Sequence, residues 1–141
     1  MRLVARCCEL LGPAPGAVAV RAPHGGRLAA ALTARVGAPA TAPAAAIVAF
    51  VGAPAEPAGR QALLAALRAE LPPGAPLVLV DHNQPRRWWA RVLGRLRLAA
   101  AGLTPARARY PAARELAALG FTVERLRLAC GERIQLVLAR R

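Results

Sequence analysis

Two residue types that carry much of enzyme chemistry are missing from this sequence. The chain contains no lysine and no serine, and its only aspartate is Asp81. Without serine there is no serine nucleophile, and without lysine there is neither a Schiff base nor the lysine of a P-loop. Catalysis by these routes is therefore excluded.

Residues that bind metals are also scarce. The only histidines are His24 and His82, and Cys7, Cys8 and Cys130 follow no CxxC or zinc-ligand spacing. We therefore expect no metal site. An odd number of cysteines, two of them adjacent, is typical of reduced thiols in a cytoplasmic protein. The alternative is an oxidation-sensing role for these thiols.

No stretch has the pattern of a targeting sequence or of a membrane span. Arg6 and Glu9 interrupt the apolar run at the N-terminus, which argues against a signal peptide. Residues 38–55 carry no charge, but three prolines break a stretch that is already short for crossing a bilayer. We therefore expect a cytoplasmic protein.

Length and composition favour one domain with an aliphatic core. The chain has 141 residues, which suits a single domain over residues 1–141. Hydrophobic residues make up 56% of the chain and aromatic residues only 4%, so Ala, Leu and Val must fill the core. All 20 basic residues are arginine, and the net charge is +13. This bacterial-like bias toward Arg and Ala resembles GC-rich coding, so part of the charge reflects genome composition rather than a partner.

Along the chain, segments whose apolar residues recur at helical spacing alternate with short apolar runs. Helical spacing predicts helices over residues 2–11, 27–36, 59–71, 89–103 and 112–119, and apolar runs predict strands over 17–21, 46–51, 77–80, 121–128 and 134–138. The last strand of this series directly follows another strand. We therefore predict an α/β fold, with an open, mostly parallel Rossmann-like sheet of about five strands, an antiparallel C-terminal hairpin and helices on both faces. Residues 121–128 alternate apolar and polar residues, which predicts a strand with one solvated face.

The second half of the chain carries a family resemblance. Residues 63–82 read LLAALRAELPPGAPLVLVDH, and residues 113–141 read ARELAALGFTVERLRLACGERIQLVLARR. These blocks resemble parts of the class I S-adenosylmethionine-dependent methyltransferases: a helix, an L-x-P-G-G-x-L turn and the fifth strand, then the last helix and the final hairpin. The run AAAIVAFVGAP, at residues 44–54, corresponds to that family's fourth strand. The resemblance extends over about residues 45–141.

The first half departs from the pattern of that family. There the first strand ends in an acidic residue and a turn of the form V-L-D-x-G-C-G-x-G, whereas residues 18–32 read VAVRAPHGGRLAAAL. Val20 stands in the place of the acid, and no acid occurs between Glu9 and Glu56. Residues 37–45 leave room only for a linker where the family has its second and third strands. We therefore expect the first strand to form an exposed sheet edge through which a homodimer or a heteromeric partner associates.

The resemblance implies S-adenosylmethionine as the cofactor. Its binding residues would be His24, Gly25 and Gly26 in the first turn, and Val51 and Gly52 after the fourth strand. Amides at the N-terminus of the helix that follows the turn would face the ligand. The alternative is that the turn is an ordinary connection between a strand and a helix, because its acidic partner is missing.

Three polar residues follow the strand predicted over residues 77–80. Asp81, His82 and Asn83 would lie at the carboxyl end of a parallel strand, where open α/β sheets bind ligands. His82 is the candidate catalytic residue, as a general base near neutral pH, and Asp81 and Asn83 are candidate substrate-binding residues. The alternative is that this trio only caps the loop through hydrogen bonds to the backbone.

An arginine-rich stretch follows at residues 86–114, where there is no acid. Trp88, Trp89 and Tyr110 in this stretch are further candidate substrate-binding residues. A basic amphipathic helix with tryptophans fits a membrane surface or a lipid-like acceptor. Arginine and aromatic residues together also fit RNA, by neutralising phosphates and stacking on bases. In the third interpretation, the apolar stripe caps the substrate side of the molecule and the arginines are solvated.

The resemblance and the candidate residues lead to one predicted function and two alternatives. The prediction is a methyltransferase-like protein that transfers a methyl group from S-adenosylmethionine to a small or lipophilic acceptor, mainly by positioning the acceptor. The first alternative is a catalytically inactive methyltransferase-like partner or scaffold subunit. The second is an arginine-rich RNA-binding module. Likeness of fold alone does not choose among them.

Overall fold

Within the described residues, the helices and strands lie where the sequence pattern predicts them, to within two residues at their ends; residues 101–103 of the predicted fourth helix lie outside the described residues. The computed structural model describes residues 2–13, 16–23, 26–37, 42–51, 57–83, 85–100 and 112–141. The helices are α1 (Arg2–Leu11), α2 (Gly26–Val36), α3 (Pro57–Glu70), α4 (Trp88–Ala100) and α5 (Ala112–Ala118). The strands are β1 (Val18–Arg21), β2 (Ala45–Ala49), β3 (Pro76–His82), β4 (Thr122–Ala129) and β5 (Ile134–Arg140). This order confirms the predicted α/β class.

The five strands form one open sheet in the order β1-β2-β3-β5-β4. Strands β1, β2 and β3 run parallel to one another, whereas β5 runs antiparallel to both β3 and β4. A tight connection at residues 130–133 joins β4 to β5, which only antiparallel neighbours allow. The predicted Rossmann-like sheet with an antiparallel C-terminal hairpin is confirmed.

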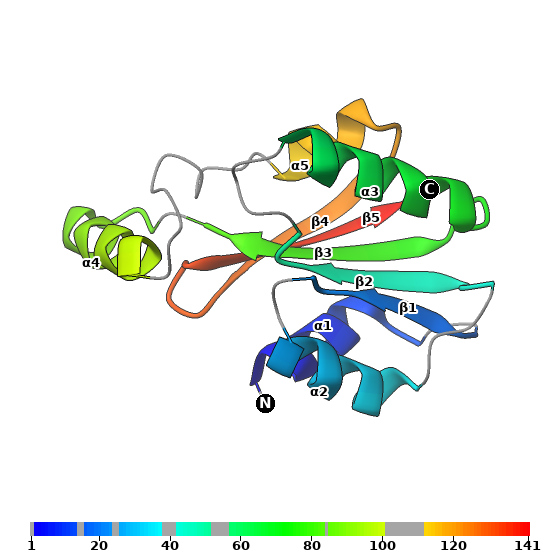
Figure 1. The fold of residues 1–141 in the computed structure, drawn as a ribbon, viewed down its shortest axis with the longest axis horizontal. Coiled ribbons are helices and arrows are strands. Elements are labelled where there is room, and N and C mark those ends of the chain that lie inside the picture. The colour runs from blue at the N-terminus through cyan, green and yellow to red at the C-terminus, as the bar shows by residue number, and fades with distance from the viewer. Residues whose placement is uncertain are drawn as a thin grey trace.

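Helices cover both faces of this sheet, as Figure 1 shows. On one face, Leu64 of α3 and Leu116 of α5 belong to the same buried cluster as Leu79 of β3. On the other face, Leu32 of α2 packs in a second cluster with Val78 of β3. The central strand is therefore buried on both sides, which explains its continuous apolar sequence.

The cysteines are free thiols in different environments. Cys7 of α1 is buried in the second cluster. Burial raises the pKa of the Cys7 thiol to about 12, and the neighbouring Cys8 adds to this rise. The Cys7 thiol therefore stays protonated and unreactive at neutral pH. Cys130 lies exposed in the turn of the C-terminal hairpin.

Strand β2 ends two residues before the predicted end. Phe50 adopts a φ of 51°, a left-handed conformation that turns the chain out of the sheet and that residues other than glycine seldom adopt. The Phe50 amide still donates a hydrogen bond to the Val80 carbonyl at 2.9 Å. Val51 is only 2% exposed, so the turn directs the chain back against the protein.

Strand β1 forms one edge of the sheet. The Ala17 carbonyl accepts hydrogen bonds from the amides of Ala44 and Ala45. Because the backbone groups of a strand alternate in direction, those of Val18 and Val20 point away from β2. Among the described residues, none pairs with this outer side.

The outer strand β4 carries a β-bulge between Val123 and Arg125, which shifts its register against β5. Because the bulge adds one residue, Val123, Leu126 and Leu128 pair with Ala139, Val137 and Gln135 and share one face of the sheet. Val123 packs on the cluster beneath α5, whereas Leu126 and Leu128 are 49% and 37% exposed. The apolar residues of β4 thus share one face, as the alternating pattern predicts, but two of them stay exposed.

Candidate functional site

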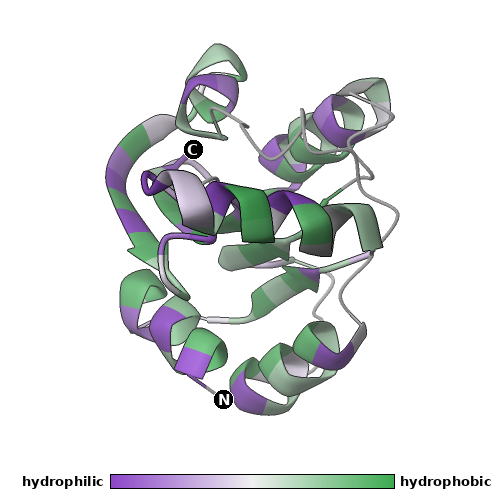
Figure 2. Cartoon of the chain, turned by 90° about the vertical axis from the view of Figure 1, so that its left-hand side faces the viewer, coloured by the Kyte–Doolittle hydropathy of each residue, from purple (hydrophilic) through white to green (hydrophobic). Residues whose placement is uncertain are grey.

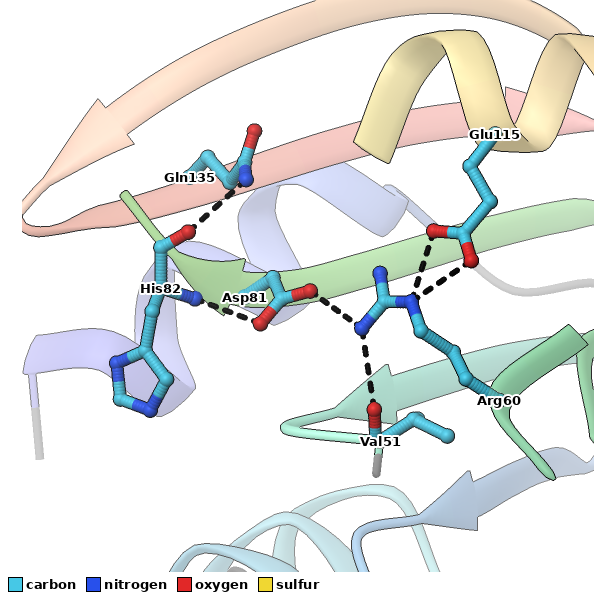
Figure 3. A network of polar contacts seen from close by, with 6 residues as sticks. All are labelled: Val51, Arg60, Asp81, His82, Glu115 and Gln135. Carbon is cyan, nitrogen blue, oxygen red and sulfur yellow. Dashed lines mark hydrogen bonds and ion pairs between the residues drawn. The ribbon is translucent and has the colours of Figure 1, made fainter. Parts of the chain in front are cut away.

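Charged and polar side chains gather at the carboxyl ends of β2 and β3 (Figure 3). Asp81 and His82 are the last residues of β3, and Val51 follows β2. Helix α3 brings Arg60 to this place, and α5 brings Glu115. The topology thus brings Arg60 into contact with Glu115, which is 55 positions away in the sequence.

Arg60 is the centre of this cluster. Its Nη1 lies 2.5 Å from Asp81 Oδ2 and donates a hydrogen bond of 3.1 Å to the Val51 carbonyl. Its Nε lies 2.8 Å from both carboxylate oxygens of Glu115. One guanidinium therefore ties together the ends of β2 and β3 and the start of α5.

The cluster is buried, so its charges must satisfy one another. The side chains of Arg60, Asp81 and Glu115 are only 3%, 6% and 14% exposed. Burial by itself lowers the pKa of Arg60, but the two carboxylates outweigh it and raise that pKa above its ordinary value. The cation is thus permanent, and it holds both carboxylates in fixed positions.

His82 lies on the other side of the strand. Its ring points away from Arg60 and contacts the Phe50 ring, with 4.6 Å between the centroids and an angle of 34° between the planes. Burial lowers the pKa of His82, and the charge of Asp81 only partly opposes this effect. At neutral pH the imidazole is therefore neutral and can accept a proton.

The backbone around His82 is held by side chains. Its amide donates to Asp81 Oδ1 at 2.7 Å, and its carbonyl accepts from Gln135 Nε2 at 3.0 Å. The next residue, Asn83, donates from Nδ2 to the Glu132 carbonyl at 2.8 Å. These are the bonds expected if the trio at residues 81–83 caps the loop. The catalytic role of His82 and the substrate-binding roles of Asp81 and Asn83 stay predictions.

The sequence interpretation missed Arg60, Glu115 and Gln135. A usable signal was present for Arg60, which is four residues before Leu64 and thus on the same face of α3. Leu64 is fully buried. An arginine within a buried stripe needs a carboxylate partner, and Asp81 is the only aspartate in the chain.

The residues predicted to bind the cofactor are only partly described. His24, Gly25 and Gly52 lie outside the described residues. Gly26 is the first residue of α2, and a Cβ at this position would meet nothing within 4 Å. Val51 is buried, and Arg60 binds its carbonyl. Gly26 and Val51 as cofactor contacts stay predictions.

Two of the three predicted substrate residues of the arginine-rich stretch lie away from this cluster. Tyr110 lies outside the described residues. Trp88 and Trp89 belong to α4, which projects beyond the carboxyl ends of the strands (Figure 1), and they are 75% and 48% exposed. Among the described helices, none has the length and apolar character needed to cross a membrane.

A hollow of about 440 Å³ lies elsewhere, between α1 and the C-terminal hairpin. It is lined by Arg6, Glu9, Arg127, Leu128 and Leu136. Arg127 and Glu9 form an exposed ion pair there at 3.4 Å. Since neither Asp81 nor His82 lines it, this hollow is separate from the polar cluster.

Several solved structures have a fold similar to that of this chain. The fold is an open Rossmann-like sheet closed by an antiparallel hairpin, and more specifically it is that of class I S-adenosylmethionine-dependent methyltransferases. The pyocyanin biosynthetic protein PhzM matches with a TM-score of 0.68 and 16% identity, over 93% of this chain and 52% of PhzM. A SAM-dependent methyltransferase from Aquifex aeolicus matches with a TM-score of 0.64 and 13% identity, over 96% of this chain and 88% of that one.

The human N-acetylserotonin methyltransferase, solved in complex with SAM, is also similar. Its TM-score is 0.59 and its identity 15%, over 99% of this chain and 51% of that enzyme. This chain thus spans about half the length of PhzM and of the human enzyme. No protein-family model matches the sequence, and no curated protein matches it significantly.

The positions and partners of the carboxylates show whether the described residues can bind S-adenosylmethionine. A carboxylate is the usual partner of ribose hydroxyls in Rossmann-like folds. Neither β1, which ends at Arg21, nor β2, which ends at Ala49, closes in an acid. Asp81 and Glu115 are bound to Arg60, Glu70 pairs with Arg21 at the end of β1, and Glu9, Glu124 and Glu132 contact other arginines. The described residues therefore offer the ribose no carboxylate that is free of an arginine, and Glu56 is the one acid outside them.

The described residues also contain no group of three histidine, cysteine or acidic side chains placed to hold a metal ion. The polar cluster itself supplies two chemical groups. These are a fixed, permanently paired arginine on one side of β3 and a neutral imidazole on the other side.

Proposed function

We propose that this chain is a methyltransferase-like protein that acts by binding a partner rather than by transferring methyl groups itself. The observation that carries the proposal is the distribution of carboxylates. Glu70 pairs with Arg21, the last residue of β1, and Asp81 and Glu115 beside the end of β3 are both held by Arg60 at 2.5–2.8 Å. Releasing either one to bind a ribose would leave the buried guanidinium short of a partner, which is costly.

The partner in this proposal is a second copy of the chain, paired through β1. The outward backbone groups of Val18 and Val20 offer hydrogen bonds along the edge of the sheet. An edge of this kind is self-complementary under a twofold axis, because two identical strands pair antiparallel. Pairing would extend the sheet on the side where the related family has further strands.

The first test is calorimetric titration of the full chain with S-adenosylmethionine and with S-adenosylhomocysteine. We expect no saturable heat of binding for either compound. Stoichiometric binding of one molecule per chain would overturn the non-catalytic role. If binding occurs and Glu56→Gln abolishes it, then Glu56 supplies the ribose ligand that the described residues lack.

The second test is the oligomeric state, measured by sedimentation equilibrium. Val20→Pro removes an outward N–H without removing a bond to β2, so we expect it to shift a dimer toward the monomer. The matched variant Val20→Thr keeps the N–H and should remain dimeric. A wild-type chain that is monomeric at all concentrations would overturn pairing through β1.

An active methyltransferase is the second candidate, and His82 is the observation that favours it. A half-buried, neutral imidazole at the carboxyl end of β3 has the protonation state that a general base requires. In this reading a small or lipophilic acceptor lies beside His82. Cofactor binding in the calorimeter, together with loss of methyl transfer in His82→Gln, would favour this candidate.

A further inference from the structure

Helix α4 presents its apolar residues to the outside of the molecule. Its most exposed large apolar side chains are Trp88 at 75%, Leu96 at 64%, Leu93 at 51%, Trp89 at 48% and Val92 at 47%. A surface helix normally turns this face toward the core and its polar face toward water. The apolar face of α4 therefore lacks a partner within the described part of the chain.

The five apolar residues share one side of the helix. At 100° per residue they fall within an arc of roughly 140°. The half-buried residues Ala90, Arg91 and Gly94 lie on the opposite side, which is thus turned toward the rest of the protein. Figure 2, which views the molecule from the side where α4 lies, shows apolar and polar residues interleaved along the helix.

The base of α4 is anchored to the sheet. Arg91 donates from Nε to the Pro85 carbonyl at 2.7 Å, which closes the first turn of the helix. The Arg86 amide donates to Glu132 Oε2 at 2.9 Å, and Asn83 bonds the Glu132 carbonyl. The turn of the C-terminal hairpin therefore fixes the point from which α4 projects.

Arginines lie along one edge of this apolar face and just before the start of the helix. Arg86, Arg87 and Arg95 are exposed, and the sequence contains no acid between Asp81 and Glu115. The Arg87 guanidinium lies 6.0 Å from the centroid of the Trp89 ring. A second α4 brought face to face with this one would add further arginines and no carboxylate. Charge complementarity thus favours an anionic surface over another copy.

We propose that α4 docks on the surface of an anionic lipid bilayer. The indoles, Val92, Leu93 and Leu96 enter the boundary between headgroups and acyl chains, and the flanking arginines bind lipid phosphates. The helix lies in the plane of the membrane and does not span it. This inference does not depend on whether the protein transfers methyl groups, because it uses none of the residues of the polar cluster.

The chain offers a direct probe, because Trp88 and Trp89 are its only tryptophans. The full chain is titrated with vesicles of phosphatidylcholine alone and with vesicles that also contain phosphatidylglycerol. On the anionic vesicles we expect a blue shift of the tryptophan emission and quenching by brominated acyl chains. Apparent affinity should fall by about tenfold or more on neutral vesicles or in high salt.

Two matched variants separate docking from folding. Leu96→Glu places a charge in the apolar face of α4, and Leu126→Glu does the same at an exposed leucine of β4. Leu96→Glu should weaken vesicle binding by about tenfold or more, and Leu126→Glu should leave it unchanged. Both should keep the circular dichroism and the thermal midpoint of the wild type, because both leucines are exposed.

Several results would overturn the proposal. One is unchanged tryptophan emission on both kinds of vesicle in a folded chain. Another is equal loss of binding in the two variants. Stronger quenching by a single-stranded oligouridine than by anionic vesicles would indicate that the apolar face of α4 binds RNA. Self-association of the chain that Leu96→Glu abolishes would indicate that this face is an interface between copies.

Discussion

Helices α3 and α4 are similar in length and composition but opposite in what they bury. Both are rich in Leu, Ala and Arg, with 14 and 13 residues. Helix α3 places Leu64 and Leu67 in the core, whereas α4 leaves Leu93 and Leu96 more than half exposed. An amphipathic pattern therefore predicts that a helix has an apolar face and a polar face. The tertiary structure determines which of the two faces packs against the rest of the protein.

The arginines of the two helices differ in the same way. Arg60 of α3 is 3% exposed and lies between two carboxylates. Arg95 of α4 is exposed, and no acid neighbours it in the sequence. The same residue type thus fixes the internal architecture in one helix and supplies surface charge in the other. The chain-wide arginine bias hides this difference in the sequence.

The largest expected effect is the loss of the buried cation. Arg60→Met would leave Asp81 and Glu115 buried without a counterion, and we expect it to lower the free energy of unfolding by about 3–5 kcal/mol. Arg95→Met, on α4, should change it by less than about 0.5 kcal/mol. Urea unfolding followed by circular dichroism measures both values.

A compensated variant sharpens this result. In Arg60→Met with Asp81→Asn and Glu115→Gln, no buried charge remains, so part of the lost stability should return. A triple variant no more stable than Arg60→Met alone would mean that packing, rather than charge, makes Arg60 important. Equal effects of Arg60→Met and Arg95→Met would remove the contrast between the two helices.

The next effect concerns the leucines. Leu64→Ala removes a fully buried side chain from α3 and should cost about 2–5 kcal/mol. Leu96→Ala, in the exposed face of α4, should cost less than about 0.5 kcal/mol. The measurement is the shift of the urea midpoint at constant slope. A large cost at Leu96 would show that some part of the chain covers this face in solution.

The fold could be predicted from the sequence because its signals are local. Buried runs such as residues 77–80 and leucine stripes such as that of α3 report which elements form, and their order implies a mostly parallel sheet. The bulge in β4 and the left-handed Phe50 were not predicted, because they depend on contacts with neighbouring strands. The left-handed Phe50 ends β2 two residues before its predicted end, and the bulge adds one residue to β4.

The site could be predicted only in part. Asp81, His82 and Asn83 were found because polar residues at the end of a buried strand are conspicuous in a sequence. Arg60 and Glu115 were missed, because they lie on different helices and only the folded chain brings them to Asp81. The orientation of α4 could not be predicted from the sequence either. Its periodicity predicts an apolar stripe but does not say which residues pack against that stripe.

The smallest expected effect concerns β3, where Asp81 and His82 face opposite sides of the sheet. Burial lowers the folded-state pKa of His82 below its ordinary value of 6.5. The unfolded chain therefore binds this proton more readily, so the stability contributed by neutral His82 is complete above pH 6.5 and declines as the pH falls through the folded-state pKa.

We expect wild type to lose more stability than His82→Gln between about pH 7.5 and pH 5.5. Urea midpoints of both proteins at the two pH values measure this difference, and the narrow range keeps most carboxylates ionised. Equal losses of stability in the two proteins would mean that His82 is as solvated in the folded chain as in the unfolded one. In that case burial would not keep His82 neutral, and thus able to act as a base.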